Sequence, residues 1–166
     1  MNMSKHLISK IGAGALIIDK ENNSILLSKK NYGPIKDKWT FPEGYVDKYE
    51  SLIEAIKREM KEELNGDIEV NDLVAVRYRR SKKNPTVYFV FNCLLLNKEE
   101  LKINDKEEIN DFKFFNIEQA EESPEIYSLV KIILNKYKNN SNSNFKKADF
   151  FPSEMKVSKN DYFLYL

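Results

Sequence analysis

Short runs of apolar residues near the start of the chain predict a β-hairpin. The run Ile11–Ile18 is followed by the turn-forming pair Asn22–Asn23, and a second apolar run then occupies residues 24–28. Gly12 and Gly14 lie in the first run, but no third glycine and no helix follow, which argues against a dinucleotide-binding loop. We therefore expect the two glycines to allow close backbone packing within a strand.

Two longer apolar stretches predict the centre of a sheet. Strands are expected over Ile68–Arg79 and Thr86–Leu96, paired antiparallel because only a short charged turn separates them. A further short strand is expected over Phe112–Phe115, and apolar residues at helical spacing predict a helix from about Pro124 to Lys138. Strands flanked by helices place the fold in the α/β (α+β) class.

Residues 51–64 carry the clearest helical pattern in the chain. Ser51 and Glu54 have the spacing of a capping box, and Asn65-Gly66 can end the helix because both residues tolerate a left-handed backbone. The apolar positions recur every three or four residues, as on one face of a helix. They are Leu52, Ile53, Ile56, Met60 and Leu64.

The composition narrows the class of protein. The 166 residues, of which 42% are hydrophobic, suit one globular domain. With 27 Lys+Arg against 26 Asp+Glu, the chain lacks the strong positive charge of a nucleic-acid wrapper. Cys93 is the only cysteine, which excludes an internal disulfide and a Cys-type zinc site. No uncharged apolar run is long enough to cross a membrane, and we predict a cytoplasmic protein.

Three glutamates lie close together on the helix predicted over residues 51–64. At about 100° per residue, Glu59, Glu62 and Glu63 fall within roughly a 100° arc beside the apolar stripe. Their mutual repulsion would be relieved by Mg²⁺ or Mn²⁺, which prefer hard oxygen ligands. The alternative is a solvated helix face on which Lys57 and Lys61 form ion pairs with the glutamates.

A wider set of spacings distinguishes these two interpretations. Gly44 is followed after five residues by Glu50, and seven residues later by the run 58–63, Arg-Glu-Met-Lys-Glu-Glu. This register resembles the Nudix box, the signature of the Nudix (MutT-like) hydrolases. The resemblance covers about residues 10 to 135, and it implies an α/β/α sandwich with a mixed β-sheet between helices.

Segments on both sides of the box also look like that family. Upstream these are Gly14–Asp19, Ile25–Leu27 and Trp39–Pro42, and downstream Glu108-Ile109 precedes Phe114-Phe115. We predict a Nudix domain over residues 1–138 and a C-terminal extension over 139–166. The extension consists of a polar linker, residues 139–148, and an aromatic tail that we expect to dock on the domain.

The resemblance implies a role for each residue of the box. Glu59, Glu62 and Glu63 would coordinate Mg²⁺, with the Gly44 carbonyl as an additional ligand, while Arg58 would orient the carboxylates. The general base would be Glu62 or Glu63, and coupled carboxylates leave this choice open.

Two further glutamates belong to the implied site. Glu50 lies almost opposite Glu59 on an extrapolated helix, so a structural role in the turn before the helix is expected. The additional glutamate that the family often supplies from a later loop matches Glu107 or Glu108, and Glu108 is preferred.

The chain departs from the family pattern at two positions. Glu43 stands where a glycine is usual, and it is either a surface glutamate or an extra carboxylate beside the site. Asn65 stands where another glycine is usual, and it is an acceptable replacement at a left-handed cap.

The implied activity is Mg²⁺-dependent hydrolysis of the pyrophosphate bond of a nucleoside diphosphate linked to another moiety. The alternative is a Nudix-fold regulatory module that binds a nucleotide without turnover, and an isomerase is a third hypothesis. A small-molecule nucleotide is the expected partner, rather than nucleic acid or membrane, and the chain is expected to be a monomer or homodimer. Arg77, Arg79 and Tyr88 are candidate substrate contacts, although they could equally be ordinary residues of a strand and its solvated turn.

Overall fold

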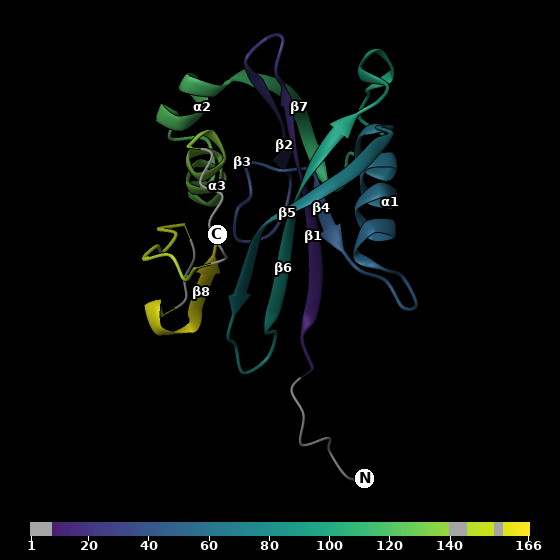
Figure 1. The fold of residues 1–166 in the computed structure, drawn as a ribbon. Helices are drawn as coiled ribbons and strands as arrows, with labels where there is room; N and C mark the ends of the chain where they lie inside the picture. Colours follow the sequence, from purple (N-terminus) through teal and green to yellow (C-terminus); the bar gives the residue numbers. More distant parts are fainter. Residues whose placement is uncertain (1–7, 140–145, 155–157) are drawn as a thin grey trace.

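Helix α1 (Leu52–Leu64) packs on one face of a mixed β-sheet, and α2 (Ile117–Glu122) and α3 (Ser128–Lys138) lie on the other side (Figure 1). The computed structural model describes residues 8–139, 146–154 and 158–166. The strands are β1 (Lys10–Asp19), β2 (Ser24–Lys30), β3 (Trp39–Thr40), β4 (Glu43–Tyr45), β5 (Ile68–Arg79), β6 (Thr86–Leu95), β7 (Ile109–Asn116) and β8 (Tyr162–Tyr165). The predicted α/β/α arrangement is confirmed.

The sheet is mixed because one pair of its strands is parallel. The strand order is β3-β2-β1-β6-β5-β8, with β4 also paired to β1 and β7 to β2. Strands β1 and β6 run parallel, and the other pairs are antiparallel. The predicted hairpin corresponds to β1 and β2, and the two long predicted strands pair antiparallel as β5 and β6.

Alternating side chains of β1 feed two separate cores. Leu16 belongs to the core under α3, whereas Ala13, Ala15 and Ile17 face the core under α1. This alternation follows from the two-residue repeat of a strand. Of the predicted apolar stripe of α1, Ile56, Met60 and Leu64 are buried, Leu52 is half-buried and Ile53 is exposed.

Local signals in the sequence set both ends of α1. Ser51 accepts a hydrogen bond from the Glu54 backbone, and the Glu54 carboxylate accepts one from the Ser51 backbone, which completes the capping box. At the other end Asn65 has φ 56°, the left-handed conformation expected of it. The predicted start and end of this helix are both correct.

The two glycines of β1 make room for an aromatic side chain from β6. A Cβ added at Gly14 would lie 2.0 Å from the Tyr88 hydroxyl oxygen, and one at Gly12 would lie 3.1 Å from the Tyr88 ring. The expected close packing at these glycines is therefore present. It allows Tyr88 to lie across the neighbouring strand.

The helix predicted from about Pro124 to Lys138 is present as α3, whereas α2 was not predicted. The structure has the short helix α2, a turn, and then α3, which begins only at Ser128. The Asn116 side chain caps α2, and proline disfavours helical backbone in the residue before it, so α2 ends before Pro124. Strand β4 was not predicted, and β7 is longer than predicted.

The C-terminal segment adds a strand to the edge of the sheet. Strand β8 pairs antiparallel with β5 and lies on the same side as α3 (Figure 1). Its side chains Tyr162 and Leu164 are buried, and the rings of Phe150 and Phe151 pack against Tyr162. Residues 140–145 of the predicted linker lie outside the described residues. Among those described, no helix has the length and apolar character needed to cross a bilayer.

Truncating Leu164 tests whether β8 is an integral part of the sheet. Leu164 is fully buried, so Leu164→Ala should lower the free energy of unfolding by about 2–4 kcal/mol in urea denaturation. Tyr165 in the same strand is 37% exposed, and Tyr165→Ala should cost less than about 1 kcal/mol. Equal effects of the two substitutions would show that β8 does not dock as described.

Candidate active site

The glutamates singled out in the sequence lie where α1 faces β4 and the end of β2. Glu59, Glu62 and Glu63 project from α1, whose neighbours in the fold include β1, β4 and β5. Glu59 and Glu63 are buried, whereas Glu62 is exposed. Two basic residues form ion pairs with these glutamates: Arg58 pairs with Glu59 and Glu62, and Lys30 pairs with Glu63.

Arg58 bonds three of the glutamates at once. Its Nε and Nη2 donate to the two carboxylate oxygens of Glu50 at 2.9 and 3.0 Å, and its Nη1 donates to Glu59 and to Glu62 at 2.9 Å each. Nη2 also donates to the backbone carbonyl of Tyr45 at 2.8 Å. These charge-assisted bonds raise the pKa of Arg58, with Glu50 as the largest contributor. Arg58 therefore fixes the orientation of two of the candidate ligands.

Glu50 occupies a position in the turn before α1. Besides its paired bonds to Arg58, its carboxylate accepts a hydrogen bond from the Asp47 backbone at 3.0 Å. The Arg58 bonds lower the pKa of Glu50, so it stays ionised. Both of its oxygens are therefore engaged in holding the turn and Arg58 together.

The sequence analysis did not identify Lys30, which forms a buried ion pair with Glu63. The Lys30 Nζ donates to Glu63 Oε1 at 2.7 Å and to the Glu43 carbonyl at 3.1 Å. Burial raises the pKa of the Glu63 carboxyl to about 7, although the Lys30 charge opposes this shift. Strand periodicity offered a signal, because Lys30 lies on the same face of β2 as Leu26, which packs under α1.

Glu59 lies against the backbone of β4. A Cβ added at Gly44 would lie 1.8 Å from the Glu59 carboxyl carbon, so only glycine allows this approach. Burial raises the pKa of Glu59, and the negative charges of Glu108 and Glu62 add to the effect while Arg58 opposes it. Glu108 therefore lies within electrostatic range of Glu59, and it accepts a hydrogen bond from the Tyr32 hydroxyl at 3.2 Å.

The donor groups fit a divalent cation of the Mg²⁺ type. Within the described residues no three acidic, histidine or cysteine side chains converge on one point. Glu59 and Glu62 are bonded to Arg58, and Glu63 is bonded to Lys30. The available donors are carboxylate and carbonyl oxygens, the ligands that Mg²⁺ and Mn²⁺ prefer. A buried carboxylate beside other carboxylates, packed on a bare glycine backbone, suits a cation of this type.

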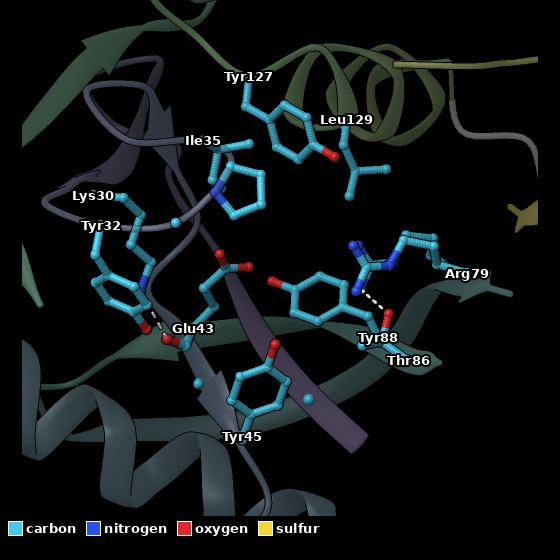
Figure 2. A pocket seen from close by; sticks show the side chains of 15 residues that line it. Lys30, Tyr32, Ile35, Glu43, Tyr45, Arg79, Thr86, Tyr88, Tyr127 and Leu129 are labelled. Atoms are coloured by element: carbon cyan, nitrogen blue, oxygen red, sulfur yellow. Dashed lines mark hydrogen bonds between the residues drawn. The ribbon is translucent and has the colours of Figure 1, made fainter. Parts of the chain in front are cut away.

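A pocket of about 160 Å³ lies next to these glutamates. Its lining joins Lys30 and Gly44 to Arg77, Arg79 and Tyr88, the three candidate substrate contacts (Figure 2). The lining also includes Tyr32, Glu43, Tyr45, Tyr127 and Leu129. Glu43 is half-buried in β4 rather than on a surface loop, and its side chain points into the pocket (Figure 2).

Three further residues of β5 and β6 lie outside this pocket. The ring of Tyr78 stacks on Phe163, and Phe91 belongs to the core under α1. Cys93 is buried, and burial raises the pKa of its thiol to about 12, which removes it as a nucleophile.

Comparison with known proteins identifies proteins of similar sequence. A family model described as NUDIX domain matches residues 9–133. Nudix hydrolase 7 of Arabidopsis thaliana is 28% identical over 119 residues, which are 69% of this chain and 42% of that protein. The ADP-ribose pyrophosphatase of Methanocaldococcus jannaschii is 31% identical over 103 residues, which are 61% of this chain and 59% of that protein. The matched region is thus less than two thirds of each of these relatives.

Solved structures share the fold. A NUDIX hydrolase from Nitrosomonas europaea superposes with a TM-score of 0.65 at 26% identity, covering 82% of this chain and 74% of that one. A MutT NUDIX hydrolase from Burkholderia pseudomallei superposes with a TM-score of 0.66 at 23% identity, covering 78% and 98%.

Removing the Lys30 charge should destabilise the protein in a pH-dependent way. In Lys30→Met the Glu63 carboxylate is buried without its cation, and the free energy of unfolding at pH 8 should fall by about 3–5 kcal/mol. The pKa of Glu63 in the folded protein lies above the ordinary value of 4.5, so folding favours its protonated form. The loss should therefore be small at pH 5.5 and grow as the pH rises through the folded-state pKa.

Denaturant unfolding at several pH values measures this loss. The double variant Lys30→Met/Glu63→Leu removes both charges and should recover most of the stability at pH 8. An equal loss of unfolding free energy at pH 5.5 and pH 8 would contradict the assignment of Glu63 as the buried charge that loses its partner.

Proposed function

The chain belongs to the NUDIX domain family, and from this membership we propose that it is a divalent-cation-dependent hydrolase of phosphoanhydride bonds. The substrate class is a nucleoside diphosphate linked to another moiety. Relatives named ADP-ribose pyrophosphatase, and a structural neighbour named UDP-X diphosphatase, support this class. The observation that carries the proposal is the group of α1 glutamates that Arg58 and Lys30 hold beside an open pocket.

We assign the cation to Glu59, Glu62 and the Gly44 carbonyl, with Glu63 as a further ligand. Mg²⁺ bound there would stabilise negative charge on phosphate oxygens and acidify a water molecule. Arg58 holds the Glu59 and Glu62 carboxylates in fixed orientations, which reduces the reorganisation needed when substrate binds.

Among the α1 glutamates, Glu62 is the preferred general base. Glu63 is buried and bonded to Lys30, whereas the Glu62 side chain is 58% exposed and bonds Arg58 through only one oxygen. An exposed carboxylate can accept a proton from an attacking water and release it to solvent. Glu108, within electrostatic range of Glu59, is the second candidate.

A panel of nucleotides tests the activity directly. The panel should contain NTPs, ADP-ribose, nucleotide sugars and dinucleoside polyphosphates, with products separated by chromatography. We expect cleavage of one class in Mg²⁺ and its loss in EDTA, with kcat reduced by about 10²–10⁴-fold in Glu62→Gln. No turnover of any member, together with tight nucleotide binding, would replace the hydrolase by a nucleotide-binding module.

Two adjacent glutamates provide a matched test of the loop before β7. Glu108 is half-buried and lies near Glu59, whereas Glu107 is exposed. Glu108→Gln should lower kcat by at least about tenfold, and Glu107→Gln should leave it unchanged within about twofold, measured on the substrate found in the panel. The reverse order would move the role to Glu107, and two inert variants would exclude this loop from the chemistry.

A further inference from the structure

The wall of the pocket beside the glutamates contains buried polar atoms without a well-formed hydrogen bond, although the Tyr88 hydroxyl faces Glu43 and the hydroxyls of Tyr127 and Tyr162 face each other. Among the described residues, five such atoms lie in or next to its wall. They are the hydroxyls of Tyr88, Tyr127 and Tyr162 and the Nε atoms of Arg77 and Arg79. Tyr88 is 6% exposed and Tyr127 is 3% exposed. Buried polar groups without well-formed bonds are costly, so this wall offers bonding capacity to a ligand.

Strand register explains how these groups come together. Arg77 of β5 lies opposite Tyr88 of β6 and, on its other side, opposite Leu164 of β8. Arg79 is paired in the same way with Thr86 and Tyr162. Residues directly opposite in antiparallel strands project from the same face, so both arginines point toward the same region.

Helix α3 closes this region from above. Tyr127 directly precedes α3, and its ring projects toward Tyr88 (Figure 2). The Tyr127 hydroxyl lies near the Tyr162 hydroxyl and the Arg77 guanidinium, because each tyrosine and Arg77 affect the pKa of the neighbouring tyrosine. The groups thus reach the region from β5, β6, β8 and the start of α3.

The two arginines carry charge that the protein does not neutralise. Neither forms an ion pair within the described part of the chain. Arg77 donates to the Thr86 hydroxyl at 3.3 Å and lies 5.0 Å from the Tyr88 ring centre, while Arg79 donates to the Asn84 carbonyl at 3.1 Å. All of these partners are neutral.

Glu43 is the only acidic residue among those lining the pocket, and it lies at the opposite end from the arginines. The strand order β4-β1-β6-β5 puts Tyr88 between Glu43 and the arginines, as Figure 2 also shows for Arg79. Lys30 is already paired with Glu63. The arginine end of the pocket therefore keeps an excess of positive charge.

The tyrosines at this end can serve as donors. Burial raises the pKa of Tyr162 to about 12, and it raises those of Tyr88 and Tyr127 as well. All three hydroxyls therefore keep their protons at neutral pH. Phenol and guanidinium groups together match a ligand with several acceptor oxygens and a negative charge.

We propose that Arg77, Arg79, Tyr88 and Tyr127, backed by Tyr162, form a subsite for a second oxyanion of the substrate. The oxyanion is a phosphate monoester or a carboxylate carried by the substrate away from the bond that is cleaved, for example on the ribose of the nucleoside. The proposal rests on the hydrolase function proposed above. An uncharged sugar or base in this position would leave both guanidinium groups without a counter-charge.

The C-terminal strand β8 forms part of the wall of this subsite. Tyr162 belongs to β8, and β8 lies outside residues 9–133, the region matched by the family model. The subsite is thus partly built from a segment that the family match does not include. Within the proposed subsite, Tyr162 is the residue that the C-terminal extension contributes.

Substrate pairs that differ by one phosphate provide the test. NADPH against NADH, and coenzyme A against its 3′-dephospho form, each change only the second oxyanion. We expect kcat/KM to favour the phosphorylated member by at least about tenfold, and the ratio to fall to about one in Arg77→Gln. Tyr162→Phe, which removes a single oxygen, should lower the ratio about threefold. Lys82→Gln, at the exposed tip of the β5–β6 hairpin, is the control and should leave the ratio unchanged.

Binding without turnover separates this inference from the hydrolase proposal. Calorimetry in EDTA with inorganic phosphate, and separately with acetate, should detect binding that is weakened at least about tenfold in Arg77→Gln. The stronger of the two identifies phosphate or carboxylate as the natural group. Arg77-dependent binding in a protein that hydrolyses nothing would support the subsite and overturn the hydrolase. Hydrolysis without pair discrimination, and without Arg77-dependent anion binding, would overturn the subsite alone.

Discussion

The site depends on the way two cations share the carboxylates of α1. Glu59, Glu62 and Glu63 repel one another, and Glu59 and Glu63 are also buried. Arg58 holds the first two, and Lys30 pairs with the third from the end of β2. Without these cations the helix could not keep its acidic edge against the core, because buried unpaired carboxylates are costly. We propose that the same bonds also position the carboxylates for a metal ion.

Local sequence signals predicted the parts of this arrangement that form locally. The capping box and the left-handed Asn65 determine α1, and the spacing of the box residues identified the site. Lys30, strand β4 and strand β8 were not assigned, because each depends on contacts between residues distant in sequence. Helix α2 was not predicted, and α3 begins four residues later than expected because Pro124 and the residue after it form a turn.

The pocket links three features that seemed unrelated in the sequence. Gly12 and Gly14 leave room for the Tyr88 ring, the hairpin end places Arg77 and Arg79 on one face, and the C-terminal tail brings in Tyr162. Several polar atoms of the pocket wall lack a well-formed hydrogen bond, in contrast to the fully bonded cluster around Arg58. We propose that the Arg58 cluster serves the reaction and that the neighbouring pocket wall receives a ligand.

Direct observation of metal binding would test the central claim that the α1 glutamates form a cation site. Electron paramagnetic resonance of Mn²⁺ titrated into the full chain reports free and bound metal without requiring a substrate. We predict that the wild type binds Mn²⁺ and that Glu59→Gln lowers the affinity at least about tenfold. The control Glu69→Gln alters an exposed residue of β5 and should leave the affinity unchanged. Equal binding by the wild type and Glu59→Gln would contradict the central claim, as would no binding by the wild type.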